Sequence, residues 1–121
     1  MTNNNNETNI FCKRLKEARL AVGLSQKKLG MAIGLDEFVA STRVNRYELG
    51  VHKVDLEMAK KFAEVLEVPL AYFYAEDDNL AELVRRFEML GDKAKSEVME
   101  SLARVEVESL KAGMKKKKVK V

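Results

Sequence analysis

The chain has little of what disulfide-rich, zinc-binding or membrane-spanning proteins are built from. Its only cysteine, Cys12, cannot form an internal disulfide, and its only histidine, His52, leaves a zinc site short of ligands. The opening MTNNNNETN has neither the positive nor the apolar part of a signal peptide, and no apolar run reaches membrane-spanning length. We therefore expect no metal, no disulfide framework, no membrane segment and a cytoplasmic location.

What the chain does contain is typical of a soluble helical protein. Of its 121 residues, 46% are hydrophobic and 34% are charged, so it can bury a core and still keep a solvated surface. This length suits one ordinary domain and leaves no room for a large catalytic domain beside a regulatory one. We predict an all-α protein, in which a five-helix bundle is followed by a C-terminal helical hairpin.

The formal net charge of +3 hides an uneven distribution. Residues 13–53 hold nine Lys and Arg against four Asp and Glu, whereas residues 54–110 hold seven against fourteen. Six lysines, beginning at Lys111, follow with no acidic residue among them. A basic first half beside an acidic second half indicates a polyanion as the partner of one face.

Composition divides the chain into four segments. Residues 1–8 have nothing to bury and are predicted to be a disordered leader, and the lysine-rich residues 113–121 a disordered tail. Residues 9–78 carry short apolar stripes at helical spacing and are predicted to form the bundle. Residues 79–112 are predicted to form the hairpin, which must pack on the bundle or on a second copy of the chain. The hairpin is therefore the candidate dimerisation element.

Capping residues predict where the helices start, and the spacing of apolar residues predicts which face of each helix is buried. Asn9 is the predicted N-cap of the first helix, whose inner face carries Phe11, Leu15, Ala18 and Val22. Further predicted N-caps are Ser25, Asp55 and Asp92, and the helix after Asp55 carries an apolar stripe that starts at Leu56.

The third helix is harder to place because the segment LDEFVA at residues 35–40 has no clear period. We predict an extended turn there, and a helix that begins at Ala40 or Ser41 and ends at Leu49.

Two short helices joined by a turn, the second exposing polar side chains, can place a helix in the major groove of DNA. The stretches RLKEARLAVGLSQKKLGMAIG, STRVNRYELG and DLEMAKKFAEVLEVPLAYFY resemble the Xre and Cro/CI family of phage-type helix-turn-helix repressors over about residues 10–75. The most diagnostic parts are the Gly-Leu-Ser-Gln start of the first motif helix, Gly30, and the Arg-Tyr-Glu-x-Gly ending of the second.

The resemblance implies a lambda-repressor-like bundle and a sequence-specific regulator of transcription that binds double-stranded DNA. We expect a repressor, encoded by a bacterium or a phage and associated with the nucleoid, that inserts the helix around residues 41–48 into the major groove as a homodimer. Half-sites about 34 Å apart suit such a dimer.

Candidate DNA-contacting residues follow from the outer faces of the two motif helices. With Val44 and Tyr47 inward, the outer face of the second helix carries Ser41, Thr42, Asn45 and Arg46. Asn45 suits an adenine edge and Arg46 a guanine edge, while Ser41 and Thr42 suit bases, thymine methyls or phosphates. Gln26, Lys27 and Arg43 are placed for phosphate contacts. The alternative is that the outer face is merely solvated.

The resemblance also implies an ion pair between Arg19 and Glu48. It implies that His52 and Lys53 contact the DNA backbone. Gly30 is expected to let the two motif helices approach closely. The sequence departs from the family pattern in the four extra residues between Gly34 and the second motif helix.

Two other classes of function are an interaction module and an enzyme. An antitoxin-like module would bind DNA in the same way and hold a protein partner through residues 80–121, and its lysine tail would fold on an acidic partner. The alternative for the tail is a nonspecific contribution to DNA binding or solubility. For an enzyme, the sequence has no glycine-rich phosphate loop, no positioned nucleophile and no metal-ligand cluster, so we expect no catalysis and no cofactor.

Overall fold

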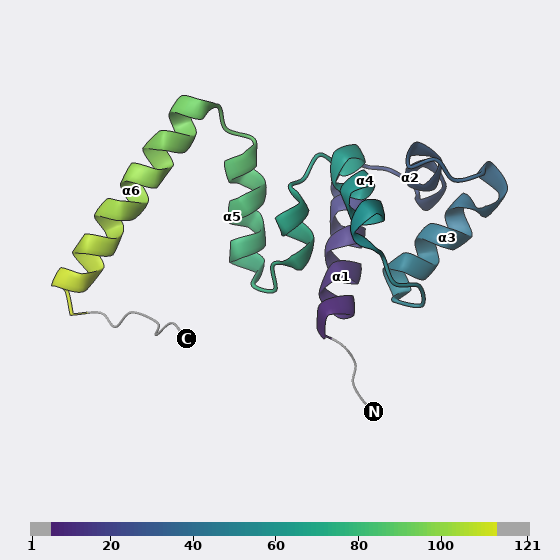
Figure 1. Cartoon of the computed structure of the whole chain (residues 1–121), viewed down its shortest axis with the longest axis horizontal. Helices are drawn as coiled ribbons and strands as arrows, with labels where there is room; N and C mark the ends of the chain where they lie inside the picture. Colours follow the sequence, from purple (N-terminus) through teal and green to yellow (C-terminus); the bar gives the residue numbers. More distant parts are fainter. Residues whose placement is uncertain (1–5, 114–121) are drawn as a thin grey trace. The chain divides into compact units, whose positions relative to one another are not determined.

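The computed structural model of the chain describes residues 6–113, with side chains from residue 10 onward. Within that range it contains helices and no strand (Figure 1). They are α1 (Asn6–Ala21), α2 (Gln26–Ala32), α3 (Glu37–Leu49), α4 (Leu56–Leu66), the 3-10 helix η1 (Leu70–Tyr74), α5 (Asp78–Glu88) and α6 (Asp92–Lys111). The all-α class is confirmed, with α1 to α4 and η1 as the five-helix bundle.

Local signals fix most of the helix ends. The side chains of Ser25 and Asp55 accept hydrogen bonds from backbone N–H groups in the first turns of α2 and α4, at 3.0 and 2.8 Å. At the other end, Gly50 takes a φ of +79° after α3, a conformation that costs glycine little. The N-caps Ser25 and Asp55 were predicted from the sequence.

Three predicted helix starts, those of α1, α6 and α3, were wrong. Helix α1 begins at Asn6, so Asn9 lies inside it rather than at its N-cap, and residues 6–8 of the predicted leader are helical. The N-cap of α6 is Gly91, and Asp92 is the first helical residue. Residues 1–5 of the leader and 114–121 of the tail lie outside the described residues.

The largest correction concerns α3, which begins at Glu37 and not near Ser41. The Asp36 side chain accepts a hydrogen bond from the backbone N–H of Phe38 at 2.8 Å and caps the helix. The segment 35–40 is therefore mostly helical. It showed no apolar period because Phe38 and Val39 are exposed, and only Ala40 is fully buried in its first turn.

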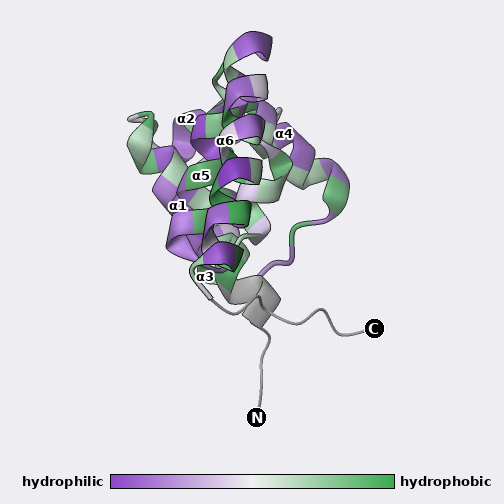
Figure 2. Cartoon of the chain, turned by 90° about the vertical axis from the view of Figure 1, so that its left-hand side faces the viewer, coloured by the Kyte–Doolittle hydropathy of each residue, from purple (hydrophilic) through white to green (hydrophobic). Residues whose placement is uncertain are grey.

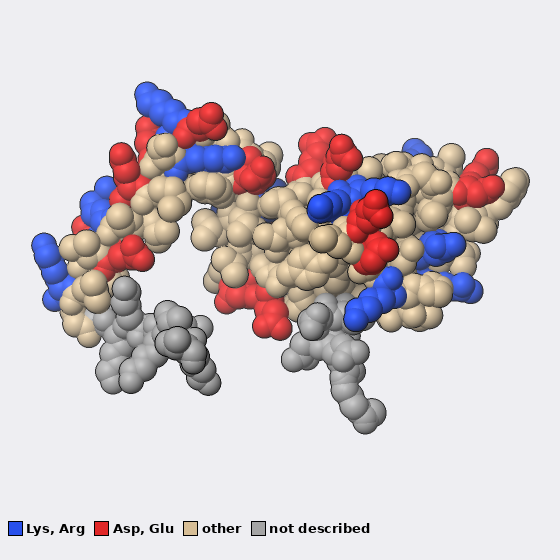
Figure 3. All heavy atoms as spheres, in the orientation of Figure 1, with Lys and Arg blue, Asp and Glu red and all other residues tan. Residues whose placement is uncertain are grey.

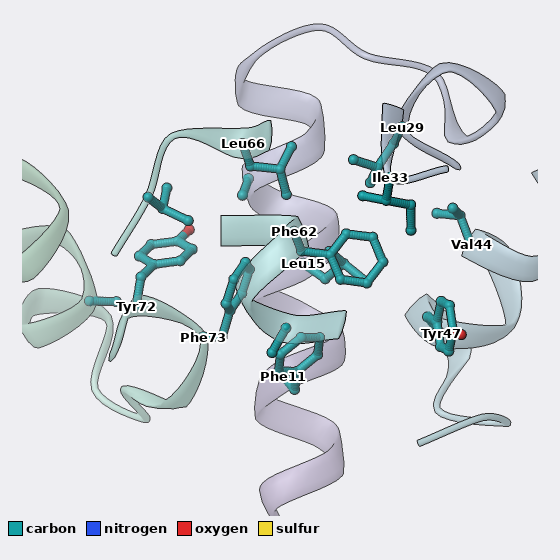
Figure 4. Close-up of a cluster of buried hydrophobic side chains, with 14 of the residues drawn as sticks. Phe11, Leu15, Leu29, Ile33, Val44, Tyr47, Phe62, Leu66, Tyr72 and Phe73 are labelled. Atoms are coloured by element: carbon teal, nitrogen blue, oxygen red, sulfur yellow. The ribbon is translucent and has the colours of Figure 1, made fainter. Parts of the chain in front are cut away.

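One apolar core holds the bundle together (Figure 4). Leu15 of α1 and Phe62 of α4 are fully buried, and in Figure 4 they lie between the side chains from α2 and α3 and those from η1. Ring centroids lie 4.8 Å apart for Phe11 and Phe73, and 5.8 Å apart for Tyr47 and Phe62. Aromatic contacts of this kind add to area burial.

Two residues expected on inner faces are exposed instead. Val22 lies just beyond the end of α1, and Leu56 is the first residue of α4. Both positions are at helix ends, where the spacing no longer fixes the direction of the side chain.

Helices α2 and α3 meet at Gly30. A Cβ atom added to Gly30 would lie 2.6 Å from the Cβ of Ala40 and 2.8 Å from its carbonyl oxygen. Neither distance leaves room for a methyl group, so glycine at position 30 is what allows the two motif helices to approach. This was the role predicted for Gly30.

A buried arginine that the sequence analysis did not single out joins α1 to the segment after η1. The Arg14 side chain donates to the carbonyl oxygens of Ala75 and Glu76 and to the carboxylates of Glu17 and Asp78. These partners satisfy a guanidinium group that is 2% exposed. The hydrogen bonds of Lys13 and Arg14 hold the pKa of the Asp78 carboxyl below its usual value.

The chain forms two compact units, residues 1–88 and 89–121. Helix α5 contacts η1 and belongs to the first unit, so that unit continues past the predicted boundary at residue 78. The division falls between α5 and α6, the two helices predicted as a hairpin. Among the described residues, no helix is long and apolar enough to cross a membrane.

We predict that Gly30→Val destabilises the protein by about 1 to 3 kcal/mol, because the added atoms must displace the backbone of α3 at Ala40. Thermal unfolding measures this as a lower Tm. Met31→Val is the matched control, because Met31 follows Gly30 in α2 and is exposed, so a similar β-branched residue there should change Tm little. An unchanged Tm for Gly30→Val would contradict the close approach.

Candidate nucleic-acid interface

The outward face of α3 carries the polar residues predicted for it. Val44 and Tyr47 are buried against the core. The predicted contact residues that are exposed are Lys27, Ser41, Thr42, Arg43, Asn45, Arg46, His52 and Lys53, whereas Gln26 is partly buried. The structure thus brings the candidates of α2 and α3 to one surface region, and places His52 and Lys53 in the loop after α3.

The Glu48 carboxylate organises this region from within. Its two oxygens accept from Nε and Nη2 of Arg19, at 2.5 and 3.2 Å, and Oε1 also accepts from Nε2 of Gln26 at 3.0 Å. Arg19 donates further to the carbonyl oxygen of Leu24, just before α2. The side chains of Arg19 and Glu48 are only 10% and 3% exposed. The expected ion pair is present, and it links α1, α2 and α3.

Gln26 extends this network to the outward face, because its Nε2 also donates to Oδ1 of Asn45 at 3.1 Å. Both amide hydrogens of Gln26 are then engaged within the protein. In this structure the Gln26 side chain therefore orients Asn45. A phosphate contact by Gln26 stays a prediction. Asn45 keeps its NH₂ group and one lone pair of Oδ1, which a bidentate adenine contact requires.

Charges around α2 and α3 are mixed. Lys27 lies 3.5 Å from the carboxylate of Glu37, and both side chains are about half exposed. Figure 3 shows blue and red side chains together at the end of the first unit that carries these helices. Two of the nine basic residues of segment 13–53, Arg14 and Arg19, are buried in ion pairs and so are not available at the surface.

Cys12 and His52 each contact Tyr47 of α3. The Cys12 thiol donates to the carbonyl oxygen of Tyr47 at 3.2 Å, and burial raises its pKa above the usual value. A raised pKa keeps the thiol protonated and weakly reactive, as expected for a core residue. The His52 ring lies edge-on to that of Tyr47, with centroids 6.3 Å apart. Among the described residues, no cluster of His, Cys, Asp and Glu could hold a metal ion.

A family model described as helix-turn-helix matches residues 15–73, which include α2, α3 and the core elements around them. The crystal structure of the transcriptional regulator BswR is 42% identical to this chain. It superposes with a TM-score of 0.74, over 77% of this chain and 92% of BswR.

Two curated relatives agree with this match. They are uncharacterised HTH-type transcriptional regulators from Sinorhizobium medicae (strain WSM419) and Rhizobium meliloti (strain 1021), each 27% identical over 63 residues. The match covers 52% of this chain and 42% of either relative, so it spans less than half of their length.

We predict that Glu48→Ala lowers the free energy of unfolding by about 3 kcal/mol, because Arg19 loses its carboxylate partner while staying buried. DNA affinity should fall with it, because Gln26 loses one of the two groups that hold it. Thermal unfolding and a DNA-binding titration measure the two effects.

Glu37→Ala is the matched control, since it removes an exposed ion pair and should cost less than about 1 kcal/mol. If Glu48→Ala left both stability and affinity unchanged, the network would have no structural role.

Proposed function

Because the chain belongs to the helix-turn-helix family of transcriptional regulators of the Xre and Cro/CI type, it is a DNA-binding protein, and we propose that it is a repressor. In this proposal a homodimer inserts α3 of each protomer into successive major grooves of one operator. A dimer that covers a promoter blocks transcription by occupancy alone.

The observation that carries the proposal is the construction of α3. Its inner face is locked into the core by Ala40, Val44 and Tyr47, and its C-terminal end is held by the Glu48 network. The outward face then presents Ser41, Thr42, Asn45 and Arg46 on a rigid element, where a 1 Å displacement would break base contacts.

Contacts to the DNA backbone come from exposed side chains around this face. Lys27 on α2, Arg43 on α3, and His52 and Lys53 after α3 are placed to meet phosphates on either side of the groove. These contacts set the register of α3 and carry no sequence information themselves.

Dimerisation is assigned to α6, which has no buried residue in the described part of the chain. Val98, Leu102 and Val105 recur at spacings of four and three, on one face of the helix. Hydrophobic and hydrophilic segments alternate along its ribbon (Figure 2). An exposed apolar stripe of this length is stable in water only when covered, and a second copy of α6 offers a matching stripe.

Substitution of Asn45 and Lys27 separates base contacts from phosphate contacts. We predict that Asn45→Ala costs about 1 to 3 kcal/mol on a selected operator and relaxes one base position. Lys27→Ala should weaken all sequences alike and reduce the salt dependence of binding by about one counterion. Selection of sites from random duplex DNA, followed by titrations at several salt concentrations, measures both; the reverse pattern would contradict the assignment.

A charge placed within the α6 stripe tests the dimer. We predict that Leu102→Glu converts the protein from dimer to monomer in sedimentation experiments, because the carboxylate would be buried without a partner. Ala103→Glu, whose position points away from the stripe, should remain dimeric. A wild-type monomer, or a Leu102→Glu dimer, would refute α6 as the dimer element, and a stoichiometric second protein bound through α6 would favour the antitoxin-like alternative.

A further inference from the structure

Phe38 is the most exposed large hydrophobic residue among the described side chains, at 89%. Single exposed apolar residues are ordinary on protein surfaces. Phe38, however, lies in the first turn of α3 and outside the hydrophobic core. Its ring lies outside the packing of the bundle, so it is accessible to a binding partner.

The face on which Phe38 lies is the outward face of α3. A helix turns about 100° per residue, so Phe38 points within about 20° of Asn45 and about 40° of Thr42. The spacing of Phe38, Ser41, Thr42 and Asn45 is i, i+3, i+4 and i+7, which is one stripe. Phe38 therefore continues the proposed DNA-contacting face toward the N-terminus of the helix.

Position along the helix strengthens this placement. In helix-turn-helix proteins the N-terminal residues of the second motif helix are the ones that contact base edges. Since α3 begins at Glu37, Phe38 occupies that first turn, about 6 Å along the axis from Thr42.

The two acidic residues at this end of the helix have partners within the protein. Asp36 accepts the N–H of Phe38 as the N-cap, and Glu37 is paired with Lys27 at 3.5 Å. Beside these two carboxylates, the first turn of α3 exposes the uncharged ring of Phe38.

We propose that Phe38 contacts the 5-methyl groups of thymines in the major groove and so sets a thymine preference in the operator. The phenyl ring of Phe38 has no hydrogen-bonding group for base edges, and the thymine methyl is the apolar feature that the major groove offers. This inference rests on the proposed insertion of α3 into that groove.

Deoxyuridine tests the contact directly, because it pairs as thymidine does and lacks only the methyl group. In the operator selected by the full-length wild-type chain, each thymine of one half-site is replaced by deoxyuridine, one at a time. Wild-type affinity falls about fourfold at the contacted position, as expected for the loss of one buried methyl group. Phe38→Ala binds thymine and deoxyuridine operators equally.

Val39→Ala is the matched control. Val39 neighbours Phe38, is 45% exposed, and points about 100° away from it, so this variant keeps the fourfold discrimination. Because neither side chain belongs to the core, both variants keep the wild-type Tm.

The proposal is overturned if no deoxyuridine weakens wild-type binding, or if Phe38→Ala retains the discrimination. A change in the sedimentation of the DNA-free Phe38→Ala protein would assign Phe38 to a protein contact and overturn it as well. Thr42→Ala and Asn45→Ala distinguish a failure of the proposed insertion of α3 from a failure of the proposed thymine contact. If both bind the operator as wild type does, the insertion of α3 is wrong; if they lose specificity while Phe38→Ala keeps the discrimination, only the thymine contact is wrong.

Discussion

The arrangement of the DNA-facing surface depends on one buried carboxylate. Glu48 accepts hydrogen bonds from Arg19 of α1 and Gln26 of α2, and it belongs to α3 itself. Three helices thus share one charged group that is almost completely shielded from water. Burying this charge is tolerated because every donor comes from a fixed backbone position, and the same fixed positions orient α3.

The close contact of Gly30 with Ala40 complements this network at the other end of α3. Because Gly30 has no side chain, the N-terminal half of α3 packs closely against α2 at Ala40. Hydrogen bonds hold the C-terminal half of α3. A helix fixed at both ends can present side chains with the precision that base contacts need. Gln26 donates hydrogen bonds to both Glu48 and Asn45, and so connects the buried network to the outward face of α3.

Burial also determines which basic residues are available at the surface. Residues 13–53 contain nine basic residues, but two of them, Arg14 and Arg19, are buried in ion pairs. Arg14 ties α1 to the carbonyl oxygens that follow η1, a role that no local pattern announces, because the partner groups lie about sixty residues away along the chain. Several other basic residues of the first half stay exposed, among them Lys27, Arg43, Arg46 and Lys53 around α2 and α3.

The sequence by itself determined the all-α class, the helix-turn-helix motif, the N-caps at Ser25 and Asp55, the close approach at Gly30 and the Arg19–Glu48 pair. These depend on local hydrogen bonds, on apolar spacing or on motif residues that resemblance makes visible. Only the tertiary structure decided where α3 begins, that Gln26 is engaged by Glu48 and Asn45, and that α5 belongs to the first unit. The physical reason is that periodicity detects a helix through its buried face, and the first turn of α3 buries only Ala40 while it exposes Phe38.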